Sequence, residues 1–378
     1  MPVLLRDVTA ALDAMYPPSY ADSWDAVGLV CGDPRQQVQR VMFAVDPAPV
    51  VVDEALDWGA DLLVVHHPLL LKGVHGVAAD TPKGRTLHRL VRGGCALFTA
   101  HTNADAPAEG VNEALAAALG LVDARVITGD VDGVDKLVTF VPHEDAERVR
   151  DALARAGAGR IGDYDSCSFT GEGEGRFRPR DGASPAIGRV GEVEVVAEAR
   201  IECVLPRPLR REVVRALRDV HPYEEPAFDL VELAEPPEGR ASRGSGRIGG
   251  LERRTSLREF AEQVREALPG TAHGVRVAGD PDRSVRTVAV TSGAGDFLLE
   301  TVLGTDADVY VTSDLRHHRA GEFLEHEGPA LVDVAHWAAE WTWLPVVERK
   351  LVQGLAERGD TVDTRVSTTC TDPWTFRL

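Results

Sequence analysis

A run of four apolar residues, Leu62 to Val65, leads directly into His66, His67 and Pro68. Such a run predicts a strand that is buried on both faces, as in a parallel sheet covered by helices. Pro68 cannot donate a ladder hydrogen bond, so the strand ends where the two imidazoles stand. Adjacent strand residues point to opposite sides, so the two rings suit two different metal ions, or one metal ion and an outer partner. Taken alone, the pair fits a plain strand end with two polar residues equally well.

The chain has 378 residues, enough for two or three domains with their own cores. Its formal net charge of −19 argues against a broad phosphate-binding surface, so we do not expect a nucleic-acid partner. This charge still allows a local pocket for a small anionic ligand. The five cysteines include no C-x-x-C pair, and we find no signal peptide and no apolar run of membrane length. We therefore expect a cytoplasmic protein with reduced thiols and no membrane partner.

The first part of the chain alternates strands and helices, which is typical of a parallel sheet. The predicted order is a helix at 5–16, a strand at 37–44, a helix at 49–58, the His66-His67 strand, a helix at 86–92 and a strand from Cys95. The last strand runs into His101 and Asp105. Sites in such sheets lie beyond the carboxyl ends of the strands, so both polar clusters are candidate site residues. For Trp24, before Asp25 and a short apolar strand, we favour packing at the strand start over a role in a site.

The middle of the chain, residues 136–233, follows a βαββαβ order, which indicates a ferredoxin-like module. The predicted strands are 136–141, 166–169, 193–205 and 227–233, and the predicted helices are 144–156 and 208–220. The Gly-, Glu- and Arg-rich stretch 171–180 is read as a loop. Residues 238–246 are read as an exit linker. A G-x-G-x-x-G match at Gly244, Gly246 and Gly249 is rejected as a dinucleotide site, because no strand is predicted before it.

The α/β pattern resumes after Gly250. The predicted elements are a helix at 256–267, strands at 285–290, 309–312 and 330–334, and a helix from His336 to about Leu355. A glycine-rich turn at Gly293 to Gly295 follows the first of these strands and could bind an anion such as phosphate through backbone N–H groups.

The last helix brings His336 and Glu340 onto one face, because they are four residues apart. Like the earlier clusters, this pair lies just beyond a strand. The candidate metal ligands are thus three histidines and two carboxylates: His66, His67, Asp105, His336 and Glu340. Such a mixture suits Zn, Fe, Mn or Co rather than Ca or Mg. Five ligands are too many for one open catalytic metal site, and they suit two divalent ions that share a carboxylate.

Several motifs together resemble the Nif-three-like family of dinuclear-metal hexameric proteins, also known as GTP cyclohydrolase I type two homologues. The motifs are Trp24-Asp25-x-Val27-Gly28-Leu29, His66-His67-Pro68, His101-Thr102-Asn103-Ala104-Asp105, His221-Pro222-Tyr223-Glu224-Glu225-Pro226 and His336-x-x-x-Glu340. The resemblance covers nearly the whole chain. It implies a discontinuous metal-binding α/β domain, residues 1–130 and 239–378, interrupted by a CutA- or PII-like insert at 131–238.

The resemblance also implies how the ligands are shared. His67, Asp105 and Glu340 would hold one metal ion, and His66, His336 and the shared Glu340 would hold the other. His101 would lie close by as an accessory or proton-transferring group. His318 matches a family histidine, although Ser313 and His317 replace the glycine and the aromatic residue usual around it. Self-association as a toroidal homohexamer is implied as well.

Two functions follow from these features. The first is a metal-dependent hydrolase of a nucleotide-like or other anionic small molecule, in which His101 or His318 transfers protons. The GTP cyclohydrolase activity itself rests on the family name alone, because the residues reveal no purine pocket. The second is a non-catalytic metal-binding scaffold, chaperone or regulator assembled as a ring.

Overall fold

The computed structural model describes residues 3–129, 133–162, 164–234 and 243–378. The chain divides into two compact units. The first combines residues 1–129 with 240–378, and the second comprises residues 130–239. Within the described residues, no helix has both the length and the apolar character needed to cross a lipid bilayer.

The first unit contains a five-stranded sheet that carries the His66-His67 strand. Its order is β17 (Asp363–Val366), β4 (Arg40–Ala44), β5 (Leu62–Val65), β6 (Ala96–Thr99) and β2 (Gly28–Cys31). The strands β17, β4, β5 and β6 are parallel, whereas β2 runs antiparallel to β6. As predicted, the strands before His66 and His101 are therefore parallel, and they are direct neighbours. The helices α2 (Pro49–Trp58) and α3 (Pro82–Arg92) supply the apolar core on one face.

A six-stranded sheet forms the other half of this unit. Its order is β13 (Val275–Ala278), β16 (Ala330–Val334), β15 (Val309–Ser313), β14 (Ser284–Ala294), β12 (Ser245–Ser256) and β7 (Val122–Thr128). The central strands β14, β15 and β16 are parallel. One face packs against α9 (Leu299–Leu303) and α10 (His317–Glu325). The strand that precedes His336 thus belongs to a different sheet from the strand that precedes His66.

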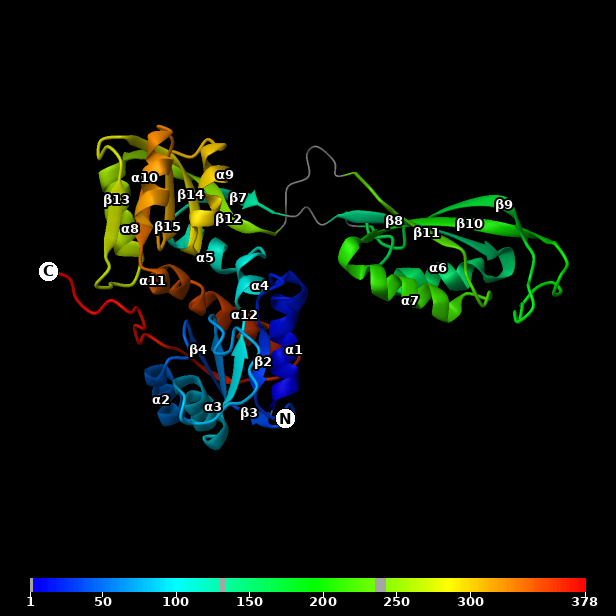
Figure 1. Cartoon of the computed structure of the whole chain (residues 1–378), viewed down its shortest axis with the longest axis horizontal. Helices are drawn as coiled ribbons and strands as arrows, with labels where there is room; N and C mark the ends of the chain where they lie inside the picture. The colour runs from blue at the N-terminus through cyan, green and yellow to red at the C-terminus, as the bar shows by residue number, and fades with distance from the viewer. Residues whose placement is uncertain (1–2, 130–132, 163, 235–242) are drawn as a thin grey trace. The chain divides into compact units, whose positions relative to one another are not determined.

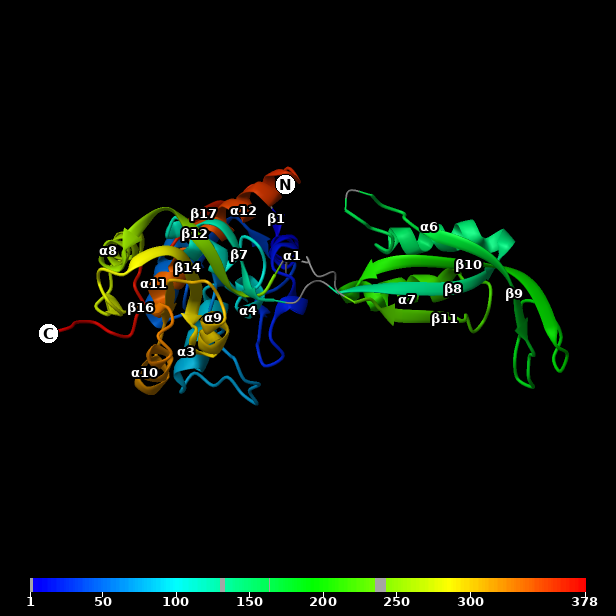
Figure 2. The same cartoon turned by 90° about the horizontal axis from the view of Figure 1, so that it is seen from above.

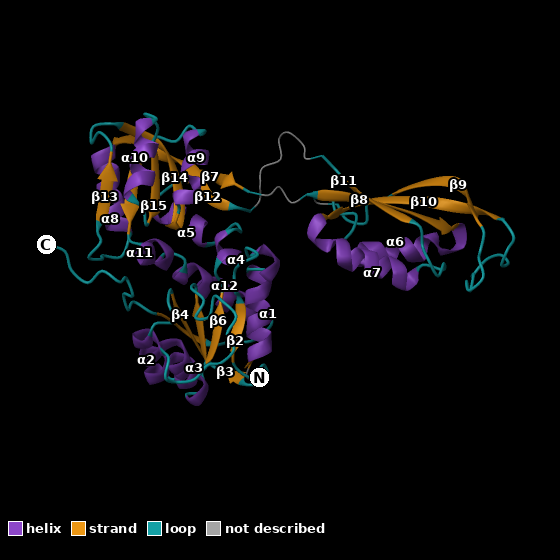
Figure 3. Ribbon diagram, viewed as in Figure 1, coloured by secondary structure: helices purple, strands orange, loops and turns teal. Residues whose placement is uncertain are grey.

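One continuous apolar core joins the two sheets. It is filled from helices α1 (Leu5–Met15), α5 (Val111–Ala118), α8 (Leu257–Ala267), α11 (His336–Trp341) and α12 (Leu344–Ala356). Figures 1 and 3 show α11 and α12 between the two sheets. Short elements complete the unit: β1 (Val3–Leu4), η1 (Pro18–Tyr20), β3 (Gln37–Val38), α4 (Thr102–Asp105) and η4 (Asp296–Leu298). Because α11 follows β16 and lies in this shared layer, its side chains can meet those at the end of β5.

The second unit is a four-stranded antiparallel sheet with two long helices. The chain order is β8 (Val134–Pro142), η2 (His143–Asp145), α6 (Ala146–Arg155), β9 (Phe169–Phe177), β10 (Glu194–Pro206), η3 (Arg207–Leu209), α7 (Arg210–Val220) and β11 (Phe228–Glu232). In the sheet the order is β11-β8-β10-β9. The apolar sides of α6 and α7 share one core with β8 and β10. Figure 2 shows β9 and β10 as a long two-stranded ribbon.

Some predicted elements differ from the observed ones. Most of the stretch 171–180, which was predicted as a loop, belongs to strand β9. This strand lies at the edge of the sheet, so it carries many glycines and charged residues, and its sequence lacks the apolar pattern of a strand. The predicted helix from His336 to Leu355 is broken into α11 and α12 at Thr342 and Trp343. Strand β7 was not predicted. The linker predicted at 238–246 falls largely outside the described residues, and β12 already begins at Ser245.

Candidate metal centre

The ends of β5 and β6 and the start of α11 meet at one place in the first unit. We define the histidine cluster as His66, His67, His101, His336 and the two carboxylates Asp105 and Glu340. Neighbouring rings have their centroids 5.1 Å apart for His66 and His67, 5.1 Å for His66 and His101, and 5.2 Å for His67 and His336. All five predicted metal ligands, and His101, are therefore brought together by the fold.

Glu340 lies at the centre of this cluster, with its side chain only 4% exposed. Its Oε1 is 3.3 Å from Nε2 of His66 and 2.8 Å from Nε2 of His336. Its Oε2 is 3.1 Å from Nε2 of His67. One carboxylate thus faces three imidazole nitrogens through both of its oxygens, which is the arrangement that a bridging carboxylate requires.

Each imidazole is oriented by an oxygen atom at its other nitrogen. The Nδ1 atom of His66 is 2.9 Å from the Ala100 carbonyl, and that of His67 is 2.7 Å from Oδ1 of Asp46. These contacts assign a proton to Nδ1 and direct Nε2 toward Glu340, the orientation found in histidines that ligate metals.

The same pattern holds for the other two rings. Nδ1 of His336 is 2.6 Å from Oδ2 of Asp314, and Nδ1 of His101 is 2.9 Å from Oδ1 of Asp25. Asp314 has a left-handed backbone with φ of 58°, a conformation that aspartate tolerates better than most residues. This backbone conformation sets the direction of the carboxylate that holds His336.

The donor atoms form overlapping groups, so the division that the family resemblance implies stays a prediction. His67, His336 and Glu340 have ligand atoms that all lie within 4.8 Å of one another. His66 instead approaches Asp105, with 3.7 Å between Nε2 and Oδ1. A second group of mutually close nitrogens comprises His66, His67 and His101. His67 thus belongs to both groups, and Glu340 faces His66 and His336 through the same oxygen.

One buried oxygen atom in the cluster, Oδ1 of Asp105, has no hydrogen-bond donor among the described residues. An isolated buried carboxylate oxygen is costly unless a cation compensates it. The residues present therefore fit metal ions, and imidazole with carboxylate is a donor set typical of borderline first-row ions.

The electrostatics of the cluster favour positive charge at the same place. Burial alone would lower the pKa of His67 and His336, but the Glu340 carboxylate and the outer aspartates raise it to about 10 for His67 and about 11 for His336. Burial raises the pKa of Asp105. Glu340 is also buried, yet the adjacent imidazoles hold its pKa well below the usual range.

The segment around Asp25 belongs to the site, contrary to the interpretation favoured from the sequence. Asp25 accepts hydrogen bonds from Nδ1 of His101 and, through its Oδ2, from the backbone N–H and hydroxyl of Thr102. Trp24 does not pack into the start of a strand. It is 56% exposed, and its ring lies edge-on to His101 with 5.9 Å between centroids. The Trp24-Asp25 pair in the printed sequence was the signal that could have revealed this role.

The structure does not bring His318 to the cluster. This residue is exposed near the start of α10, where its ring contacts that of His317. His318 is absent from the described residues that line the two cavities beside the cluster. The reason is that α10 covers the opposite face of the six-stranded sheet.

The glycine-rich turn at Gly293 lies against the cluster. Gly293 has a φ of 66°, and a Cβ atom added there would come within 2.8 Å of Oε1 of Glu340 and 3.2 Å of Nε2 of His336. The hydroxyls of Thr312 and Tyr310 donate to the carbonyls of Gly293 and Gly295, respectively. The turn thus allows the backbone to approach the carboxylate closely, a role that only glycine can fill.

Two cavities open beside the cluster. One has a volume of about 500 Å³ and is lined by His67, His101, Asp105, His336 and Glu340 together with aromatic and small polar residues. The other has about 180 Å³ and is lined by Asp46, His67, Asp314 and His336 with part of the C-terminal segment. The larger one provides space for a small molecule directly next to the candidate metal ligands.

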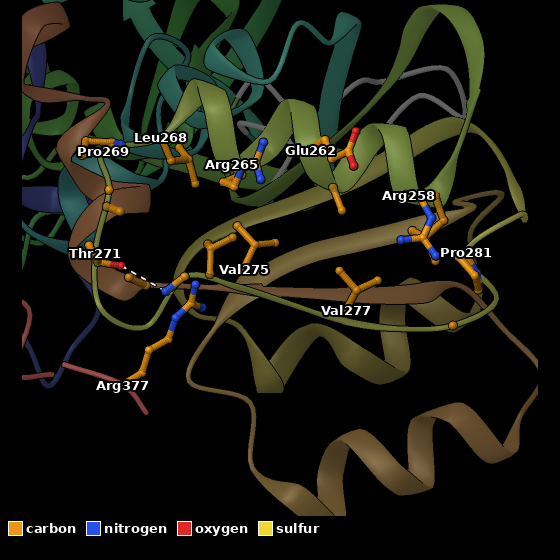
Figure 4. Close-up of a pocket in the computed structure, with 18 residues that line it drawn as sticks. Arg258, Glu262, Arg265, Leu268, Pro269, Thr271, Val275, Val277, Pro281 and Arg377 are labelled. Carbon is orange, nitrogen blue, oxygen red and sulfur yellow. Dashed lines mark hydrogen bonds between the residues drawn. The ribbon is translucent and has the colours of Figure 1, made fainter.

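A third cavity, of about 590 Å³, lies between α8 and β13 (Figure 4). Arg258, Glu262 and Arg265 line it from α8, and Val275 and Val277 line it from β13. It contains one carboxylate and no histidine among its described lining residues, so it lacks the donor set of the cluster.

A family model for Duf34/NIF3 (NGG1p interacting factor 3) matches residues 3–373. The chain belongs to the Duf34/NIF3 family. The family resemblance seen in the sequence motifs is therefore confirmed.

Several relatives match the chain over nearly its whole length. The GTP cyclohydrolase 1 type 2 homolog of Mycobacterium tuberculosis is 54% identical over 377 residues, which are 99% of this chain and 97% of the relative. That of Bacillus subtilis is 39% identical over 372 residues, 98% of each chain. The crystal structure of a Bacillus cereus protein related to NIF3 aligns with a TM-score of 0.81 at 34% identity and covers 100% of both chains.

Proposed function

We propose that this protein binds two divalent metal ions at the histidine cluster and uses them to hydrolyse a nucleotide-like small molecule. One observation carries the proposal: three imidazoles, each anchored at Nδ1 by an oxygen, direct Nε2 at the buried Glu340 carboxylate, and a buried oxygen of Asp105 beside them lacks a donor. Histidines that ligate a metal usually donate from Nδ1 to an oxygen acceptor and bind the metal through Nε2.

We assign the donor groups to two sets that share Glu340. His67 and His336 with Glu340 would hold one ion. His66 and Asp105 with Glu340 would hold the other. The donor chemistry supports Zn, Fe, Mn or Co. When bound, two such ions supply a water of lowered pKa close to neutral pH.

The remaining residues would bind and orient the substrate and move its protons. His101 has its Nδ1 held by Asp25, and its ring lies against that of His66, so its Nε2 can exchange a proton beside the metal ligands. We do not extend this role to His318, which lies on α10 away from the cluster. The cavity of about 500 Å³ would hold the substrate.

We further propose the assembly and domain plan that the family resemblance implies. The second unit would be a CutA- or PII-like ferredoxin-like insert at about 131–238, and the two flanking segments would form one discontinuous metal-binding domain. The βαββαβ order of the second unit supports this plan. Self-association as a homohexamer in the cytoplasm completes the proposal, and elution volume with light scattering tests the assembly.

Metal content per chain tests the central proposal. Protein purified without chelator should carry two ions per chain by elemental analysis, and Glu340→Gln should lose most of both, because it weakens the shared ligand. Glu357→Gln is the matched control, since Glu357 is exposed near the end of α12. Equal metal in Glu340→Gln and wild type would contradict the bridging role.

The same samples distinguish a hydrolase from a metal-dependent scaffold. A hydrolase loses turnover on chelation and keeps its oligomeric state. If chelation instead abolishes assembly or partner binding, and no turnover of nucleotide-like substrates is found in the metal-loaded protein, the scaffold function is favoured.

A further inference from the structure

The cavity beside the histidine cluster has an aromatic lining that the metal site does not need. Tyr20 and Trp24 reach it from the segment between α1 and β2, and Phe297 reaches it from the turn after β14. Trp24 is 56% exposed and Phe297 is 58% exposed. Large aromatic side chains left open to solvent inside a concave site are typical of surfaces that bind a ligand.

Trp24 is exposed, yet the segment that carries it is fixed. The backbone N–H of Asp22 donates to the Thr102 hydroxyl at 2.9 Å, and Asp25 accepts the hydrogen bonds of His101 and Thr102. The chain on both sides of Trp24 is thus hydrogen-bonded to His101 and Thr102, which follow β6. An aromatic side chain held in this way offers a flat surface at low entropic cost.

Phe297 lines the cavity from η4, the short helix that follows β14. It follows Gly293 and Ala294, whose backbone lies against Glu340 and His336. The ring of Trp24 contacts that of His101, and Phe297 lines the same cavity four residues after Gly293, which lies against Glu340 and His336. A ligand next to the candidate metal ligands would therefore meet an aromatic ring near each part of the cluster.

Outside the histidine cluster, the described lining offers no cationic side chain to a polyphosphate. No lysine or arginine is among the described residues that line this cavity, whereas Asp22 is present in addition to the candidate ligands. Arg243 stacks over Tyr20 at 4.2 Å outside the described lining. Protein sites for phosphate groups use arginine, lysine or backbone N–H donors to balance the charge. The remaining polar lining is neutral and comprises the hydroxyl or amide groups of Thr102, Asn112, Ser245, Thr291 and Ser292.

We propose that this cavity binds an uncharged, planar nitrogen heterocycle, such as a free nucleobase, against Trp24 and Phe297, and that it discriminates against nucleoside triphosphates. This inference rests on the proposed function, which places the ligand beside the metal ions. It narrows the nucleotide-like substrate class of that proposal to the base. The neutral hydroxyl and amide groups suit the donor and acceptor edges of such a ring.

Isothermal titration of the metal-loaded full chain with adenine, hypoxanthine and ATP tests the proposal, with metal per chain measured on the same samples. A free base should bind at least about tenfold more tightly than ATP. Trp24→Leu and Phe297→Leu should each weaken base binding by about 5- to 100-fold, as for loss of one stacking contact, with metal content unchanged. Phe169→Leu is the control, because Phe169 is a 69% exposed aromatic residue of the second unit.

Asp22→Asn separates charge from shape. This substitution should leave the affinity for the base unchanged and reduce the ratio of the affinities for the base and for ATP. Tighter binding of ATP than of adenine, no binding of any free base to protein with two metal ions per chain, or equal affinities in Trp24→Leu, Phe297→Leu and Phe169→Leu would overturn the inference. Metal content near zero with base binding intact would instead refute the proposed metal centre and support this inference.

Discussion

At the scale of single residues, the site depends on acceptors that fix the imidazoles. Asp46, Asp25 and Asp314 each hold one ring at Nδ1 and contribute nothing else to the donor set. Removing such an acceptor leaves the ligand in place but frees its rotation and its tautomer. We therefore expect metal affinity at the cluster to depend on these aspartates, although they are not ligands themselves.

We expect Asp314→Asn to weaken metal affinity by about 10- to 100-fold, because His336 loses its anionic acceptor. Competition with a chromophoric zinc chelator measures this change. Asp306→Asn should bind metal like wild type, since Asp306 is exposed and pairs only with Arg125. Affinities of the two variants within twofold of each other would show that Asp314 does not orient a ligand.

Metal binding should release protons and become tighter as pH rises through neutrality. The pKa of about 10 for His67 and about 11 for His336 means that both rings are protonated near neutral pH in the metal-free chain, whereas a metal ligand must be neutral. Zinc titrations by calorimetry in buffers of different ionisation enthalpy should therefore give different heats. Identical heats in all buffers would exclude proton release.

At the scale of elements, the end of β14 controls how closely the backbone approaches Glu340. Gly293→Ala should lower the free energy of unfolding by about 1–3 kcal/mol, because of its positive φ and the close contact of the new methyl group. It should also reduce metal per chain. Gly321→Ala in α10 is the control, since it has open space and should be neutral or stabilise by up to about 1 kcal/mol. Thermal denaturation and elemental analysis measure both effects.

The second unit has its own electrostatic anchor at the start of β8. The Asp135 side chain is fully buried and pairs with Arg207 and Arg210, which are about one third exposed. The hydrogen bond from Arg210 makes the largest contribution to the lowering of the Asp135 pKa below its ordinary value of 3.8. A lowered carboxyl pKa stabilises the fold above that ordinary value, and the contribution disappears as pH falls through the folded-state pKa.

Asp135→Asn should therefore destabilise the second unit by about 1–3 kcal/mol near neutral pH, less than for a fully buried pair because the arginines are partly solvated. Urea denaturation followed at about pH 7 and about pH 3 should show the difference from wild type shrinking in acid. The control is Asp229→Asn, an exposed position on β11 of the same sheet. A difference that persists unchanged in acid would contradict the ion-pair origin.

At the scale of the whole molecule, the candidate metal ligands and their outer acceptors lie in the first unit. Thr128 and Ser245 are paired in adjacent antiparallel strands, so a short loop can join the chain there. We expect a protein with residues 131–238 replaced by a short Gly-Ser linker to keep its metal per chain. Elemental analysis tests this, with circular dichroism as the check on folding. A folded deletion variant without metal would show that the second unit completes the site.

Much of the local structure could be read from the sequence. The apolar runs before His66, His101 and His336 are the strands β5, β6 and β16 with close to the predicted bounds. The helix predicted at 256–267 is α8, where the Ser256 side chain accepts from the backbone N–H of Glu259 in a capping box. These features depend on residues a few positions apart, so short patterns suffice to predict them.

The sequence by itself determined which residue types end the buried strands, and so the five candidate ligands and the family. Only the tertiary structure decided that β5 and β16 lie in different sheets, and that their ends meet around Glu340. It also decided that His318 lies elsewhere and that Trp24 lines the cavity. The physical reason is that apolar periodicity and capping act along the chain. The meeting of strand ends and rings is instead set by packing between residues that are far apart in sequence, which leaves no local pattern.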